Sequence, residues 1–128
     1  IEKDIEDNLP EILCDPIQIK QALLNIYINA RQAMEKAEEK KIHVQLRRLH
    51  SNQEMLNLII RDSGSGIKKT DIGLIFEPFY TTRKDGTGLG LSITRRIIEG
   101  HSGKIEIRNA VPCGAEVDIA LPIHTDGA

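Results

Sequence analysis

Three glycines alternate with small or apolar residues in one short segment, Gly86-Thr87-Gly88-Leu89-Gly90-Leu91. Apolar side chains recur at four-residue steps at Leu89, Ile93 and Ile97, which predicts a helix with one apolar face that ends at Gly100. A glycine-rich turn before a helix N-terminus exposes unpaired backbone N–H groups and the positive end of the helix dipole. The segment is therefore typical of a phosphate-binding turn, and a flexible turn that caps a helix is the alternative.

Composition and spacing exclude several classes of protein. A leucine stands where the dinucleotide fingerprint G-x-G-x-x-G needs its third glycine, and no apolar strand precedes the run. The 128 residues, 40% of them hydrophobic, predict a single domain over residues 1–128, and the first residue already looks internal to a fold, as in a fragment of a larger protein. The chain shows neither a bilayer-spanning apolar run nor a signal-peptide pattern. A net charge of −2 argues against nucleic acid and direct membrane contact, and two cysteines fit a reduced cytoplasmic setting.

Asp15 and Pro16 predict the start of a long helix, with Asp as N-cap and Pro at the first helical position. We expect this helix to run to about Glu39, with the core stripe Ile19, Leu23, Ile26, Ala30, Ala33 and Ala37. Asn25 and Asn29 lie four residues apart and therefore share a face. Their carboxamide oxygens are ligands that Mg²⁺ accepts, and two solvated surface residues are the alternative.

The sequence predicts strands over residues 42–50, 55–61, 104–108 and 117–121. Residues 1–7 fit a strand edge, and the end of a preceding helix is the alternative. A turn at residues 51–53 joins the second strand to the third, and a turn through Pro112 and Gly114 joins the last two. Residues 68–75 are expected to form one or two short helical turns.

Asp62 continues the inward parity of Leu56, Leu58 and Ile60 and opens the segment Asp62-Ser63-Gly64-Ser65-Gly66. A carboxylate on the buried side of a strand end is costly unless it is paired or hydrogen-bonded. Because an ionised Asp only accepts hydrogen bonds, it would select the amino group of adenine over the carbonyl of guanine. The alternative is an Asp that caps a short helix beginning near Ile67.

Three of the four aromatic residues, Phe76, Phe79 and Tyr80, crowd into five positions, which suggests a local role rather than a shared core. The polar stretch 81–85 follows, and its position between Pro78 and Gly86 predicts a mobile lid. The four histidines, none of which has a partner at metal-ligand spacing, are interpreted as structural or exposed: His43, His50, His101 and His124.

Taken together, four motifs in this order resemble the ATP-binding domain of sensor histidine kinases in the GHKL superfamily, most like its nitrogen-regulatory branch. They are an N box at residues 25–30, a first glycine box at 62–66, an F box at 76–83 and a second glycine box at 86–91. The resemblance implies an α+β fold, a two-layer α/β sandwich in which about three helices cover one face of a mixed sheet of about five strands. ATP and Mg²⁺ are the implied cofactors.

The resemblance also implies roles for individual residues. Asn25, Asn29 and Arg83 would be catalytic, Asn29 would bind the metal and Asp62 would bind adenine. The implied ATP-binding residues are Asn25, Asn29, Asp62, Gly64, Gly66, Ile67, Thr81, Thr82, Arg83, Lys84, Gly86, Thr87, Gly88, Leu89, Gly90 and Leu91. Three positions depart from the usual pattern: Gln32 and Arg83 each replace a lysine, and Ala115 replaces a threonine.

Related topoisomerase and mismatch-repair ATPases place a general-base glutamate where this chain has Asn25. A carboxamide cannot take a proton near neutral pH, so we expect slow hydrolysis and transfer of phosphate to an external histidine. That histidine would belong to a dimerisation and phosphoacceptor domain of the same protein, which would in turn serve a response regulator. The alternatives are a regulatory nucleotide-binding module, or pseudokinase, and a serine kinase of the anti-sigma-factor type. We expect a cytoplasmic domain, which a full-length protein could anchor to a membrane.

Overall fold

The computed structural model describes residues 1–50, 54–77 and 90–123. Its strands are β1 (Glu2–Ile5), β2 (Ile42–Leu49), β3 (Met55–Asp62), β4 (Lys104–Asn109) and β5 (Ala115–Pro122). The helices within those ranges are α1 (Pro16–Ala33) and α2 (Gly90–Gly100). Neither is long and apolar enough to cross a membrane.

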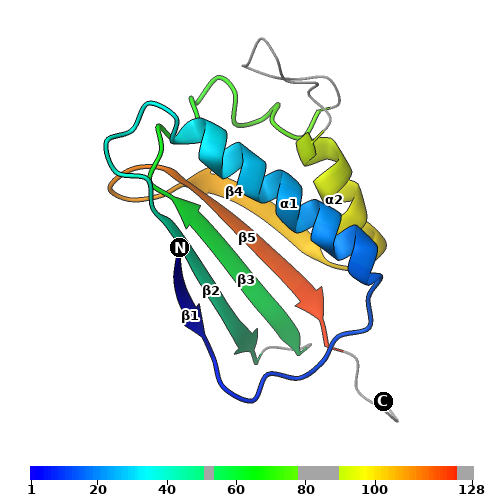
Figure 1. Cartoon of the computed structure of the whole chain (residues 1–128). Coiled ribbons are helices and arrows are strands. Elements are labelled where there is room, and N and C mark those ends of the chain that lie inside the picture. Colours follow the sequence, from blue (N-terminus) through cyan, green and yellow to red (C-terminus); the bar gives the residue numbers. More distant parts are fainter. Residues whose placement is uncertain (51–53, 78–89, 124–128) are drawn as a thin grey trace.

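The strands form one sheet in the order β1-β2-β3-β5-β4. β1 pairs with β2 in parallel, and the other three pairings are antiparallel. Both helices lie on the same face of this sheet, with α2 beside α1 and over β4 (Figure 1). The predicted mixed five-stranded sheet in a two-layer α+β fold is therefore confirmed. The expectation of about three helices exceeds the two found in the described ranges, because residues 68–77 form a chain of hydrogen-bonded turns instead of a helix.

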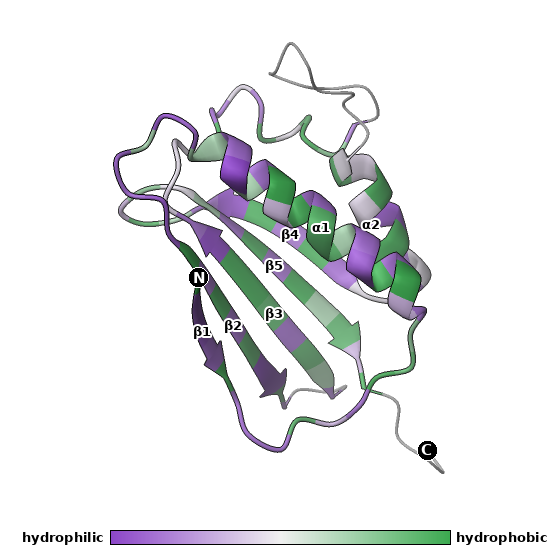
Figure 2. Ribbon diagram, in the orientation of Figure 1, coloured by the Kyte–Doolittle hydropathy of each residue, from purple (hydrophilic) through white to green (hydrophobic). Residues whose placement is uncertain are grey.

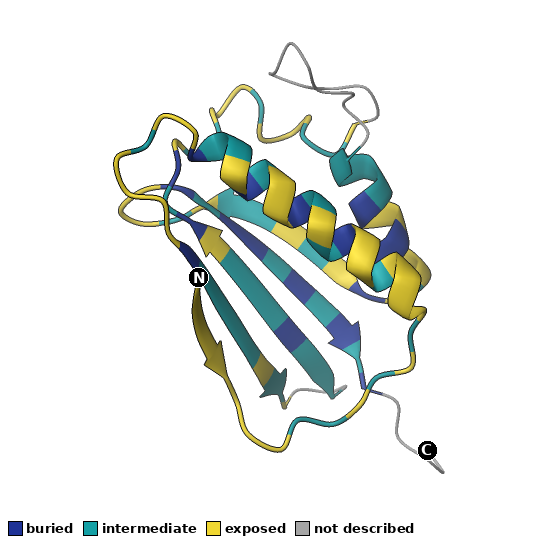
Figure 3. Ribbon diagram, viewed as in Figure 1, coloured by how far each residue is buried: buried dark blue, intermediate teal, exposed yellow. Residues whose placement is uncertain are grey.

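The core lies between the helices and the central strands. Val117, Ile119 and Leu121 of β5 alternate toward the helices and pack with Ile26 of α1 and Ile98 of α2. Figure 2 shows the apolar residues of the strands alternating with polar ones, and Figure 3 shows buried residues along β5 beneath the helices. The predicted period-two pattern is thus realised in the sheet.

The first helix begins where the sequence predicts. The Asp15 carboxylate oxygen Oδ1 accepts hydrogen bonds from the backbone N–H groups of Ile17 at 3.0 Å and Gln18 at 3.3 Å, and Pro16 is the first helical residue.

The same helix ends at Ala33 rather than near Glu39, which corrects the predicted boundary. In a longer helix the Ala33 carbonyl would accept from the N–H of Ala37. Here it accepts from Ser65 N at 3.4 Å, and Ala37 N donates to the Met34 carbonyl at 2.9 Å. A contact with the loop after β3 therefore replaces the next helical hydrogen bond.

The buried face of α2 also differs from the prediction. Thr94, Ile97 and Ile98 are its buried residues, whereas Ile93 is only half-buried. The Thr94 hydroxyl donates to the Gly90 carbonyl at 2.8 Å, which satisfies the polar atom inside the core.

His101 ties the end of α2 to the start of α1, which confirms a structural role. Its Nε2 lies 3.0 Å from the Asp15 backbone N, and its Nδ1 lies 2.8 Å from the Ile97 carbonyl oxygen. Because an N–H group can only donate and a carbonyl can only accept, the ring must be the neutral tautomer protonated at Nδ1.

Candidate functional site

Asp62 ends β3 with its side chain on the helix-facing side of the sheet, and it is 8% exposed. Its Oδ1 accepts from the backbone N–H groups of Gly64 at 2.9 Å and Ala115 at 3.2 Å. Among the residues that the structure describes, no donor is bound to Oδ2. The N–H of Ile67 is held by Asn109, so Asp62 does not cap a helix there. Within the described part of the chain, the carboxylate therefore keeps one acceptor oxygen without a partner.

Both glycines after Asp62 occupy positions that a side chain would disturb. A Cβ at Gly64 would lie 2.5 Å from the Ala33 carbonyl oxygen, so this loop packs directly on the end of α1. Gly66 has φ +77°, in the left-handed region that favours glycine. The glycines of this predicted motif thus shape the loop.

Asn25 and Asn29 lie on one face of α1, and both are half-buried rather than fully solvated. The Asn25 amide Nδ2 donates to the Gly90 carbonyl at 3.3 Å, across to the first residue of α2. Asn29 lines two cavities beside Asp62. The structure therefore brings the predicted asparagine pair, the glycine loop and the start of α2 to one region.

The smaller of these cavities, about 120 Å³, is an apolar slot with Asp62 in its wall. Its lining comes from both helices, the central strands and the loop after β3: Ile26, Asn29, Ala30, Ala33, Ile60, Asp62, Gly66, Ile67, Ile75, Leu91, Ile107, Ala115 and Val117. Among the described residues of that lining, Asp62 is the only ionisable one, in a setting that otherwise suits a flat apolar group.

The larger cavity, about 580 Å³, opens beside the slot and shares Asn29, Ala33 and Gly66 with it. Polar and charged residues such as Gln32 and Lys36 contribute to its wall. The two cavities together combine an apolar recess with a polar mouth, which is the arrangement of a small-molecule site.

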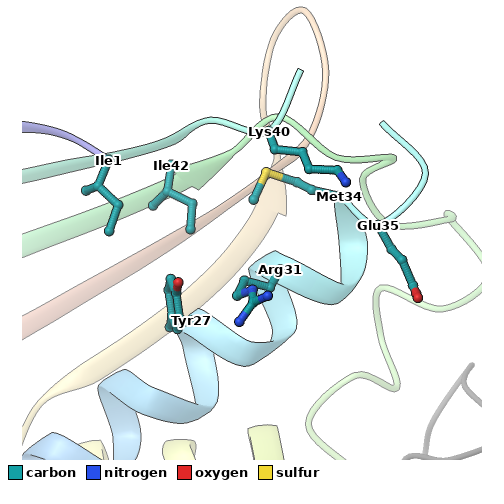
Figure 4. Close-up of a pocket in the computed structure, with 7 residues that line it drawn as sticks. All are labelled: Ile1, Tyr27, Arg31, Met34, Glu35, Lys40 and Ile42. Carbon is teal, nitrogen blue, oxygen red and sulfur yellow. The ribbon is translucent and has the colours of Figure 1, made fainter. Parts of the chain in front are cut away.

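A further hollow of about 280 Å³ lies on the other side of α1, toward β2 (Figure 4). Its lining includes Tyr27 and Arg31, whose guanidinium carbon is 5.9 Å from the Tyr27 ring centroid, and the apolar side chains of Met34 and Ile42. None of the predicted site residues that the structure describes lines this hollow. The candidate site is therefore the slot that Asp62 lines together with the larger cavity beside it.

The second glycine box is described only at its end. Gly90 begins α2 and Leu91 lines the apolar slot. Phe76 is also described, and its ring centroid lies 5.3 Å from the guanidinium carbon of Arg95. The remaining predicted residues lie outside the described residues: Phe79, Tyr80, Thr81, Thr82, Arg83, Lys84, Gly86, Thr87, Gly88 and Leu89.

The sequence interpretation missed the role of Asn109 near the site, and it predicted Gly114 only as part of a turn. Asn109 holds both backbone groups of Ile67, and Gly114 lies so close to the backbone of Asp62 that a Cβ there would overlap its carbonyl oxygen. Gly114 has φ +87°, and the sequence placed it in the turn before the last strand without indicating its contact with Asp62. Asn109 carried no signal, because its partner lies in a loop distant along the chain.

Comparison with known proteins agrees with this geometry. Residues 14–125 match the family described as histidine kinase-, DNA gyrase B-, and HSP90-like ATPase. The chain is 38% identical to the sensory histidine kinase/phosphatase NtrB of Vibrio alginolyticus over 96% of its own length, and it spans 37% of that protein. It spans a quarter or less of several other curated kinases that it matches.

Solved structures show the same fold. The catalytic domain of histidine kinase ThkA superposes with a TM-score of 0.80 at 33% identity, covering 94% of this chain and 76% of that one. Full-length ShkA in complex with AMPPNP superposes with a TM-score of 0.75 at 28% identity, covering 99% of this chain and 26% of that one. The chain therefore belongs to the family of histidine kinase-, DNA gyrase B- and HSP90-like ATPases, as its four motifs predict.

Proposed function

We propose that this chain binds Mg-ATP around Asp62 and donates the γ-phosphoryl group to a histidine on a separate dimerisation and phosphoacceptor domain. A response regulator would receive the phosphoryl group next, in two-component signal transduction. The observation that carries the proposal is the carboxylate oxygen of Asp62 that no described donor binds, in the wall of an apolar slot. The complex of the similar kinase ShkA with AMPPNP supports a nucleotide as the ligand.

The slot favours adenine over guanine. An ionised carboxylate offers acceptors only, so Oδ2 of Asp62 can accept from the 6-amino group of adenine but not from the 6-carbonyl of guanine. The apolar side chains of Ile67 and Ile107 line the same slot, where the faces of a purine ring would be shielded from water. Recognition would therefore combine one polar contact with apolar packing.

Asn29 fits the role of a Mg²⁺ ligand. Among the described residues, no three His, Cys, Asp or Glu side chains gather where they could hold a metal. A divalent ion here would therefore depend on the Asn29 carboxamide oxygen, water and the phosphates of the nucleotide, a set that Mg²⁺ accepts. When bound, the ion would neutralise charge on the transferred phosphoryl group.

Asn25 is placed to orient the site rather than to activate water. Its amide N–H already donates to the Gly90 carbonyl, and a carboxamide has no basic lone pair near neutral pH. Without a general base at this position, hydrolysis would be slow and a stronger external nucleophile would be needed. A histidine imidazole meets that need, because it attacks phosphorus with little deprotonation.

The acceptor histidine is expected to lie outside the described part of the chain. Both ring nitrogens of His101 are engaged in backbone hydrogen bonds. His43 and His50 lie near Glu2 and Glu54 on the strand ends, and neither lines a cavity of the candidate site. We therefore infer that the phosphoacceptor is a separate domain. The sensor kinases among the relatives favour this over a serine kinase or a pseudokinase.

Calorimetric titration of ATP with Mg²⁺ tests the proposal, with Asp62→Asn as the variant. Asn keeps an Oδ1 acceptor for the N–H groups of Gly64 and Ala115, so the loop should fold, but its Nδ2 would face the amino group of adenine. We expect affinity to fall about 100-fold, or ~2.7 kcal/mol. Asp4→Asn on the exposed strand β1 is the matched control and should bind like the native chain. No binding by the folded native chain, or equal binding by Asp62→Asn, would refute the proposed site.

A further inference from the structure

The turn between β4 and β5 holds the loop that follows Asp62. The Asn109 amide Nδ2 donates to the Ile67 carbonyl at 2.9 Å, and its Oδ1 accepts from the Ile67 backbone N–H at 2.7 Å. One side chain thus binds both backbone groups of one residue. Because Ile67 lines the apolar slot, this pair of bonds sets the position of one of the slot's walls.

Only a carboxamide can make both bonds at this length, since a carboxylate lacks the donor and a hydroxyl is too short to span both groups. Gly66, which precedes Ile67, also packs against the Asn109 side chain. A Cβ at Gly66 would lie 2.7 Å from Oδ1 of Asn109, so this side chain packs against bare backbone. Asn109 itself is exposed, which separates its role from that of a core residue.

The same turn holds the carboxylate at the other side of the slot. The backbone N–H of Ala115 donates to Oδ1 of Asp62 at 3.2 Å, and Gly114 packs against the Asp62 backbone. A hydrogen bond from Ala110 N to the Gly114 carbonyl at 2.9 Å closes the turn. The β4–β5 turn and the strand residues beside it, Asn109 and Ala115, therefore contact both Asp62 and Ile67, the polar and apolar sides of the slot.

We propose that Asn109 is a positioning residue for nucleotide binding, which acts through Ile67 without touching the ligand. This inference rests on the proposed nucleotide site. Loss of the side chain would free the Gly66–Ile67 backbone and widen the slot, so binding would have to re-order it at a cost in affinity. The fold would be little affected, because both bonds lie at the surface.

The test compares Asn109→Ala with Asn57→Ala. Asn57 is 4% exposed and donates to the Asp118 carboxylate and the Ile119 carbonyl on the far side of the sheet, so its loss should weaken the fold without reaching the slot. For Asn109→Ala we expect the Kd for Mg-ATP to rise about fivefold, or ~1 kcal/mol, with faster hydrogen exchange at the Ile67 amide. For Asn57→Ala we expect a lower thermal midpoint and an unchanged Kd, measured well below that midpoint.

The outcomes separate this inference from the nucleotide proposal. If the native chain binds Mg-ATP and Asn109→Ala binds equally well, the positioning role is wrong while the site stands. If both asparagine variants lose affinity in proportion to stability, Asn109 is merely structural and the inference is also wrong. If the native chain does not bind, the proposed function itself fails. Asn109→Asp guards against a misfolded alanine variant, because it keeps an acceptor for Ile67 N–H but faces the Ile67 carbonyl with a carboxylate, and its Kd should also rise.

Discussion

Glu116 is the centre of an ion network on the sheet face opposite the helices, and its loss should have a measurable and pH-dependent cost. Its Oε1 accepts from Arg61 Nε at 3.1 Å and Nη2 at 2.5 Å, and its Oε2 accepts from Arg108 Nε at 2.6 Å. Arg108 also donates to Asp118 at 2.7 Å. The network crosses β3, β5 and β4, so it ties the strands that carry the candidate site.

The perturbation is Glu116→Gln, which removes the charge and keeps the shape. The Glu116 side chain is 11% exposed, whereas those of Arg61 and Arg108 are 48% and 43% exposed and can return to water. Hydrogen bonds to charged groups contribute about 1.5–3 kcal/mol each when buried, and solvent screening of the arginines reduces that. We expect a loss of about 2 kcal/mol in the free energy of unfolding, or about 6–10 °C in Tm for a domain of this size.

The cost should depend on pH in a defined direction. Hydrogen bonds from Arg61, followed by those from Arg108, hold the pKa of the Glu116 carboxyl below its usual range. A carboxyl with a lowered folded-state pKa stabilises the fold fully above its unfolded pKa of about 4.3, and this stabilisation is lost as pH falls through the folded value. The stability gap between the native chain and Glu116→Gln should therefore be widest near pH 7 and should narrow below about pH 4.3.

Urea denaturation at several pH values measures the difference in the free energy of unfolding between the native chain and Glu116→Gln. Glu106→Gln is the matched control, because Glu106 lies on the same face with a 74% exposed side chain and one contact to Arg108 at 3.5 Å. Its effect should stay within about 0.5 kcal/mol. The reasoning would be refuted if Glu116→Gln lost no more free energy of unfolding than Glu106→Gln. It would also be refuted if the loss for Glu116→Gln were the same at pH 7 and pH 3.5.

Three glycine substitutions give further tests, and one of them is a control. Gly114→Ala should lower the free energy of unfolding by more than about 2 kcal/mol, because φ is +87° and the new Cβ would overlap the Asp62 carbonyl oxygen. Gly100→Ala, where no atom lies within 4 Å of the new Cβ, should be neutral by the same denaturation assay, and equal losses would contradict the close approach. Gly90→Ala should also leave stability unchanged, since no described atom lies within 4 Å of the new Cβ. It should raise the Kd for Mg-ATP about tenfold if phosphates lie against that backbone. Unchanged affinity would remove Gly90 from the phosphate site.

Local patterns were sufficient to predict most elements of this fold. The Asp15–Pro16 start of α1 depends only on adjacent residues, and the alternation in β3 and β5 reports which side chains face the helices. The end of α1 could not be predicted in this way. It depends on Ser65, whose N–H donates to the Ala33 carbonyl. In a longer helix that carbonyl would accept the next helical hydrogen bond. Similarly, Thr94 can be buried because its hydroxyl donates to the Gly90 carbonyl. Hydrophobic periodicity does not predict a buried polar residue of this kind.

The residues of the candidate site also fall into those that local patterns predict and those that depend on contacts distant in sequence. Residues that would contact the ligand, such as Asp62 and Asn29, belong to short motifs, and the residue types and spacing within each motif predict its chemistry. Residues that hold those motifs in place, Asn109 and Gly114, come from a turn more distant in sequence and contact only backbone. Any residue type can supply the backbone group to which such a side chain binds. A single sequence therefore contains no pair of residue types that would reveal the contact. A search for functional residues in chains of this fold should therefore begin with side chains that hydrogen-bond to the backbone of a glycine motif.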